Sequence, residues 1–101
     1  MARAGISRPL GSLKPDTAFE ASQAVFKELG WEIYKKRPFA FLVEARTTLS
    51  EGYILANIII NVFGDPAINL TIKSDTASQA SVDAEAQKIS AALERQLGQQ
   101  K

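Results

Sequence analysis

The chain has 101 residues, no cysteine, no histidine and a formal net charge of +1 at pH 7. That length fits one domain with a single core. The lack of cysteine excludes disulfides, thiolate catalysis and cysteine-bearing metal sites, and the lack of histidine removes the commonest metal ligand and general base. The balanced charge gives no broad field for nucleic acid or an anionic membrane. We therefore expect no cofactor, no metal and no enzymatic activity.

Residues 1–15 contain two glycines and two prolines, which predict an irregular N-terminal arm. The alternative is a short edge strand near Ile6. These residues lack the apolar segment of a secretory signal, and the chain has no run of about 18 apolar residues. We therefore expect a soluble, cytoplasmic protein without a membrane partner.

A first helix is expected from Thr17 to about Leu29, because Thr17-Ala18-Phe19-Glu20 matches a capping box and Gly30 suits a C-terminal cap. Apolar residues at helical spacing then predict its buried stripe: Ala18, Ala21 or Ser22, Val25, Phe26 and Leu29. A last helix is expected from about Ser81 to Gly98. Its buried stripe comprises Val82, Ala86, Ile89, Leu93 and Leu97.

Between the helices, alternation of apolar and polar residues predicts four strands: 31–35, 39–49, 52–63 and 67–73. Matching inward-facing residues pairs Lys35 with Phe39 and Phe63 with Ala67, which leaves three-residue loops in the first and third hairpins. Phe39, Phe41, Val43 and Ala45 are expected to point inward.

The central strand, expected within the stretch Gly52–Gly64, has one wholly apolar face: Ile54, Ala56, Ile58, Ile60 and Val62. These observations predict an α+β two-layer sandwich, in which a four-stranded antiparallel meander sheet carries two helices on one face in the order α-β-β-β-β-α. The domain covers residues 16–98, and residues 99–101 form a frayed tail.

The other sheet face is left open, and it mixes apolar and amide side chains. We therefore predict a binding or self-association surface there, formed by Leu42, Arg46, Tyr53, Leu55, Asn57, Ile59 and Asn61, with Asn69 beside them. With a two-residue loop in the second hairpin, Glu44, Asn57 and Lys73 form one cross-strand row, and Leu42, Ile59 and Thr71 the next; a four-residue loop shifts the second strand by one row. The alternative without a binding function is an ordinary half-solvated sheet with incidental apolar residues.

Two other groups of residues are weaker candidates. Lys35-Lys36-Arg37 beside Tyr34 could meet phosphates, but three cations and Pro38 are also typical of an edge strand that resists further pairing. The groups available for chemistry are Glu44, Arg46, Asp65, Thr71, Lys73 and Ser74, and ordinary surface charge pairing explains them.

We therefore predict a non-enzymatic protein-interaction module that uses the open face, as a homodimer or with a protein partner. The alternative is a small-ligand or weak nucleic-acid binding domain, although we do not expect nucleic acid as a partner.

Overall fold

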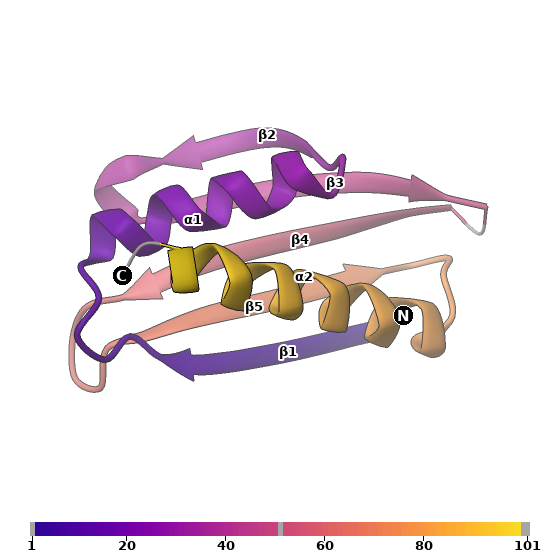
Figure 1. Ribbon diagram of the computed structural model, residues 1–101. Coiled ribbons are helices and arrows are strands. Elements are labelled where there is room, and N and C mark those ends of the chain that lie inside the picture. The colour runs from indigo at the N-terminus through magenta and orange to yellow at the C-terminus, as the bar shows by residue number, and fades with distance from the viewer. Residues whose placement is uncertain (1, 51, 100–101) are drawn as a thin grey trace.

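The computed structural model describes residues 2–50 and 52–99. In chain order its elements are β1 (Ala2–Pro9), α1 (Pro15–Glu28), β2 (Glu32–Arg37), the 3-10 turn η1 (Pro38–Ala40), β3 (Leu42–Leu49), β4 (Gly52–Asn61), β5 (Ala67–Ser74) and α2 (Gln79–Gln99). The five strands form one antiparallel sheet in the order β1-β5-β4-β3-β2. Both helices lie on the same side of this sheet (Figure 1). The expected α+β class is therefore confirmed, but the expected four strands are five.

The additional strand is β1, so the expectation of an irregular arm over residues 1–15 is wrong, and the alternative of an edge strand near Ile6 is confirmed. β1 pairs with β5 at one edge of the sheet, from Ala2 opposite Ser74 to Pro9 opposite Ala67. Pro9 is compatible with an edge strand because a residue whose N–H points away from the sheet loses no ladder hydrogen bond when it is proline. Of the expected tail, Gln99 is the last residue of α2, and residues 100–101 lie outside the described residues.

The core lies between the sheet and the two helices. α1 packs over β2, β3 and β4, whereas α2 packs over β1 and β5. The central strand contributes Ile54, Ala56, Ile58 and Ile60, which are all buried as its two-residue period predicts. β4 ends at Asn61 rather than near Gly64, and Val62 is partly buried just beyond it.

The helices follow their predicted stripes with different starting points. All five residues of the stripe expected in α2 are buried, but the helix begins at Gln79, two residues before Ser81. α1 begins at Pro15 after Lys14, and its N-cap makes no side-chain hydrogen bond, so the capping box expected at Thr17 is wrong. Proline is well suited to the first helical position because its missing N–H would have no partner there. Phe19 is buried although the stripe omitted it.

The first hairpin also differs from the expectation. Lys35 lies opposite Glu44 rather than Phe39, because η1 lengthens the connection. A bulge between Ile33 and Lys35 then shifts the register of the residues that precede it in β2. Phe41 adopts a left-handed backbone (φ 50°), and β3 begins after it. Phe39 is therefore fully exposed instead of inward-facing.

The third hairpin has a longer connection than expected. Asn61, not Phe63, lies opposite Ala67. The side-chain oxygen of Asn61 accepts a hydrogen bond from the Phe63 N–H (3.2 Å), which turns the chain out of the sheet at that point. This displaces β5 by one cross-strand row relative to β4.

Candidate functional site

The sheet surface away from the helices, here called the open face, carries every residue of the predicted binding set. Strand alternation and register place the seven together on β3 and β4: Leu42, Arg46, Tyr53, Leu55, Asn57, Ile59 and Asn61. Leu42, Leu55 and Asn57 are partly buried, and the other four are exposed. The grouping on one surface follows the prediction, and its use as a binding surface stays a prediction.

The cross-strand rows were only partly anticipated. Glu44 faces Asn57 and Leu42 faces Ile59, as the two-residue loop in the second hairpin predicts. Across β4, however, Asn57 faces Thr71 instead of Lys73, and Lys73 faces Leu55. The longer β4–β5 connection therefore brings the Lys73 ammonium into the same row as Arg46 and Leu55.

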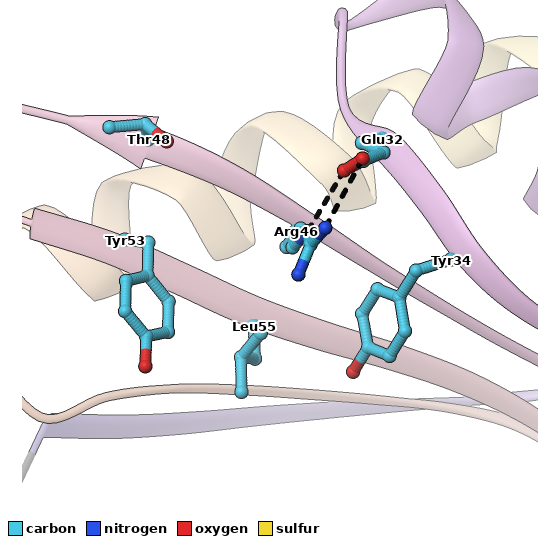
Figure 2. Close-up of a pocket in the computed structure, with 6 residues that line it drawn as sticks. All are labelled: Glu32, Tyr34, Arg46, Thr48, Tyr53 and Leu55. Carbon is cyan, nitrogen blue, oxygen red and sulfur yellow. Dashed lines mark hydrogen bonds and ion pairs between the residues drawn. The ribbon is translucent and has the colours of Figure 1, made fainter.

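A hollow of about 600 Å³ lies on the open face over β2, β3 and β4. Figure 2 shows its six lining side chains, with the helices behind the sheet: Glu32, Tyr34, Arg46, Thr48, Tyr53 and Leu55. The rings of Tyr34 and Tyr53 stand on either side of Leu55. The hollow thus has two aromatic walls and an aliphatic floor.

Arg46 is held in this hollow by a bidentate ion pair. Its Nε donates to one carboxylate oxygen of Glu32 (2.9 Å) and its NH2 group to the other (3.3 Å). The guanidinium carbon lies 5.5 Å from the centre of the Tyr34 ring, within range of a cation–π interaction. One guanidinium nitrogen points away from Glu32 into the hollow (Figure 2). Arg46 is thereby oriented while it retains donors for an anionic group.

The ionisation of these groups follows from the same contacts. The hydrogen bonds and positive charge of Arg46 lower the pKa of Glu32, and the Glu32 carboxylate raises the pKa of Arg46. Desolvation, assisted by the negative charge of Glu44, raises the pKa of Tyr34. At neutral pH the hollow therefore contains a fixed ion pair and a neutral phenol. The pKa shifts of Glu32, Tyr34 and Arg46 are all directed away from neutrality, whereas a general base requires a pKa near neutrality.

Two smaller hollows extend the first across the sheet, and Leu55 lines all three. One of about 120 Å³ lies beside Tyr53, Lys73 and Asp75, and the other of about 80 Å³ lies beside Tyr34, Asn57 and Lys73. The series runs across the strands from Glu32 on β2 to Lys73 on β5. Leu55 is therefore the centre of a shallow groove with Arg46 on one side and Lys73 on the other.

The opposite end of the open face is apolar. A hollow of about 400 Å³ is bordered there by Phe39, Ile59 and Phe63. Ile59 is 41% exposed and Phe63 is 81% exposed. The polar groups at this end are amides, on Asn61 and Asn69. The open face therefore changes along the strands from a charged aromatic groove to an apolar surface.

The fold does not bring the residues of the two weaker candidate groups together into a site. β2 alternation places Lys35 and Arg37 opposite open-face residues but Lys36 opposite the buried Val43, so the three cations do not form one cluster. The Ser74 hydroxyl is buried; it donates to the Tyr53 carbonyl (2.9 Å) and accepts from the Ala77 N–H (2.9 Å), which is a structural role. Asp65 lies outside the strands, beside Pro9 and Pro66.

Three lining residues of the main hollow were missing from the predicted set: Glu32, Tyr34 and Thr48. The alternation in residues 31–34 already indicated that Glu32 and Tyr34 point away from the core. Their proximity to Arg46 depends on β2 pairing with β3, which the bulge and η1 determine.

No protein-family model matches the chain, and no curated protein matches it. Among solved structures, the chain is similar to one described as the crystal structure of Ara h 8.0201, with a TM-score of 0.56. The similarity covers 95% of this chain and 97% of that chain at 10% sequence identity. At this identity it supports the sheet-and-helix fold alone. In the described part of the chain, no helix is long and apolar enough to cross a membrane, and no cluster of acidic residues is arranged to hold a metal.

Proposed function

We propose that the protein is a non-enzymatic binding module whose open face docks an extended protein segment that carries acidic and apolar side chains. The observation that carries this proposal is the uncovered apolar surface at the centre of the sheet. Tyr53 is 58% exposed and Ile59 is 41% exposed, although both lie on the central strand β4. Together with Phe39 and Phe63 they leave a larger apolar area in water than single scattered residues do, and such areas are typical of interaction sites.

The charges on the open face favour an acidic partner. Strand residues that alternate onto it include the cations Arg3, Lys35, Arg37, Arg46 and Lys73. The carboxylates on the same strand positions are Glu32 and Glu44, and Glu32 is already paired with Arg46. A second copy stacked face to face would bring the excess of positive charge against itself, which is unfavourable. An acidic segment meets opposite charge instead.

The charged groove and the apolar end of the open face would bind different parts of the partner segment. Arg46 and Lys73 flank Leu55, so a carboxylate on either side of an apolar side chain can be bound in the groove. The aromatic walls at Tyr34 and Tyr53 supply contact area with few rotatable bonds, as is common for energetically dominant interface residues.

A second candidate function is binding of a small aromatic or aliphatic carboxylate in the main hollow. The position of the Arg46 guanidinium, with donors directed into a space between two tyrosines, favours it (Figure 2). In that case a small molecule occupies the groove and the apolar end near Phe63 contributes nothing.

The proposal can be tested by selecting binders from a random library of displayed linear peptides. We expect enrichment of sequences in which Asp or Glu lies next to a large apolar residue, and we expect Tyr53→Ala and Lys73→Ala to weaken the selected peptides at least tenfold. Both side chains are exposed, so neither change should unfold the domain. Lys27→Ala is the matched control for Lys73→Ala, because Lys27 is an exposed cation on α1, on the covered side of the sheet.

Calorimetric titration of a selected peptide then separates the two candidates. A peptide whose affinity falls with Tyr53→Ala and with Phe63→Ala uses both ends of the open face. Binding that responds to Tyr53→Ala but not to Phe63→Ala supports the small-ligand alternative. Peptides without acidic residues, or peptides insensitive to both variants, would contradict docking on this face.

A further inference from the structure

The outer edge of β1 is distinct from the open face. β1 is an end strand of the sheet, so one side of its backbone pairs with β5 and the other side faces outward. Such an edge is a template for pairing with another strand. Which of its backbone groups face outward can be established from two sets of hydrogen bonds.

The first set involves Gln79, at the start of α2. Its side-chain oxygen accepts from the Arg3 N–H (3.2 Å), and its amide nitrogen donates to the Arg3 carbonyl (2.7 Å). The backbone groups of Arg3 therefore point away from β5, because a side chain from α2 reaches both. Gln79 makes the two hydrogen bonds that a neighbouring strand would make at this residue.

The second set fixes the alternation from the other end. The Leu10 N–H donates to the Pro66 carbonyl (2.9 Å), toward the β5 side of the chain. In an antiparallel strand, successive residues direct their backbone groups to opposite sides. Even-numbered residues of β1 thus bond inward to β5, and Arg3, Gly5, Ser7 and Pro9 direct their backbone groups outward.

These four outward-facing residues are not equivalent. Arg3 is bound by Gln79, and Pro9 has no N–H. Gly5 and Ser7 remain, each with an outward N–H and an outward carbonyl, and both residues are exposed. Among the described residues no hydrogen bond joins these outward groups to another part of the chain. Their side chains, a hydrogen and a hydroxymethyl, leave the edge accessible.

We propose that this edge pairs with the same edge of a second copy of the chain, antiparallel, about a two-fold axis that passes between the Ile6 residues of the two copies. Gly5 then lies opposite Ser7 of the second copy, and Ser7 opposite Gly5 of the second copy. Each pair exchanges two hydrogen bonds, so the outward groups of both residues are satisfied in both copies.

The edge is self-complementary in this one register, and this is why we propose a second copy of the chain rather than an unrelated strand. In this arrangement Arg3 lies opposite Pro9 of the second copy. Arg3 is already bound by Gln79, so it needs no partner, and Pro9 has no N–H to offer one. The two residues that cannot exchange two hydrogen bonds therefore meet each other at both ends, and Gly5 and Ser7, which can, meet in the middle. A register shifted by one pair in one direction places Ser7 opposite Arg3, whose backbone groups Gln79 already binds. A shift in the other direction places Gly5 opposite Pro9, which can accept from the Gly5 N–H but has no N–H for the Gly5 carbonyl.

The resulting assembly is a continuous sheet across two copies. Because directly opposite residues point to the same face, both helix layers lie on one side and both open faces on the other. α2 lies over β1 and β5 (Figure 1). The Gln79 side chain at the start of α2 binds the edge groups of β1 at Arg3. This dimer differs from the one that the sequence analysis predicted, which used the open face, and it leaves the open face free for a partner.

The decisive variant is Ser7→Pro. It removes the outward N–H of Ser7 and adds ring atoms at the edge, while the hydrogen bonds from β1 to β5 remain, because those come from even-numbered residues. Ser7→Ala is the matched control, since it keeps the N–H. Solution mass is measured by sedimentation equilibrium from about 10 µM to 1 mM, with circular dichroism as the check on folding. We expect wild type and Ser7→Ala to dimerise with equal affinity and Ser7→Pro to weaken the dimer at least tenfold.

A second measurement does not depend on any variant. Amide hydrogen exchange of the wild-type chain, followed by NMR, should show the Gly5 and Ser7 N–H groups slowing as protein concentration rises, while the Ile6 N–H is protected throughout. A wild-type chain that stays monomeric to 1 mM, exchange at Gly5 and Ser7 that is independent of concentration, or a folded Ser7→Pro that dimerises like wild type would each overturn the proposal. Tyr53→Ala should leave dimerisation unchanged, so this result is independent of the open-face function.

Discussion

Two neighbouring isoleucines on the central strand provide a stringent test of the layer arrangement. Ile58 points toward the helices, is 0% exposed and lies in the row of Val43 and Leu70. Ile59 points to the open face and is 41% exposed. The two positions share residue type, strand and neighbours in sequence, so replacing each with alanine changes β propensity almost equally. The difference between the two variants therefore measures burial.

The expected magnitudes follow from that burial. Truncating a fully buried isoleucine to alanine costs about 2 to 5 kcal/mol, because apolar contact is lost and a cavity is left. Ile59 is a little over half buried and has solvent beside it, so its truncation should cost about 1 kcal/mol. In urea titrations followed by circular dichroism, with a slope of about 1.5 kcal/mol/M, a loss of about 3 kcal/mol lowers the midpoint by about 2 M.

The comparison requires equal slopes for the two variants, so that midpoints report stability alone. If the midpoints of Ile58→Ala and Ile59→Ala fall by the same amount, both faces of β4 are buried to the same degree. The assignment of an open face, and every proposal that uses it, would then be wrong. Asn57→Ala, on the same face as Ile59, should also cost under about 1 kcal/mol.

Other expected outcomes follow from single features. Gly52→Ala should destabilise the domain by about 1 to 3 kcal/mol or more, because Gly52 has φ +131° and an added Cβ would lie 1.8 Å from Thr76 Oγ1. When thermal unfolding is measured in a Thr76→Ala background, only part of this stability should be recovered. Full recovery would show that the whole loss comes from the clash and none from the backbone conformation. Because hydrogen bonds from Arg46 lower the folded-state pKa of Glu32, the contribution of Glu32 is present above its unfolded pKa and is lost as pH falls through the folded value. Glu32→Gln should therefore flatten the decline in stability below about pH 5, and an unchanged pH profile would show that the ion pair with Arg46 does not persist in solution.

The sequence by itself determined the layers and the two faces of the central strand. A strand has a two-residue period, so Ile54, Ala56, Ile58 and Ile60 must point toward the same side, and an uninterrupted apolar row requires a covering layer. The stripe in the last helix from Val82 to Leu97 was equally plain, because its apolar spacing continues over the whole helix. These patterns are local in the sequence, and the apolar residues in them are the ones that folding buries.

The tertiary structure decided the registers and the strand at the edge. The β4–β5 register depends on where the chain leaves the sheet, which the Asn61 side chain determines through its bond to the Phe63 N–H. The β2–β3 register depends on the bulge in β2 and the left-handed Phe41, and neither changes the apolar alternation enough to be recognised beforehand. As a result the sequence indicated the members of the open face but not the proximity of Glu32, Arg46 and Tyr34.

β1 shows the same limit most clearly. Its sequence, with Gly5 and Pro9, resembles an unstructured arm because its own residues supply little of the energy that orders it. The free energy comes from long-range contacts: the ladder to β5, burial of Ala2 and Leu10, and the ion pair of Arg8 with Glu94 in α2. Those partners lie more than 50 residues away in the chain, so no local pattern contains them. Only the assembled fold places Gly5 and Ser7 at an accessible edge.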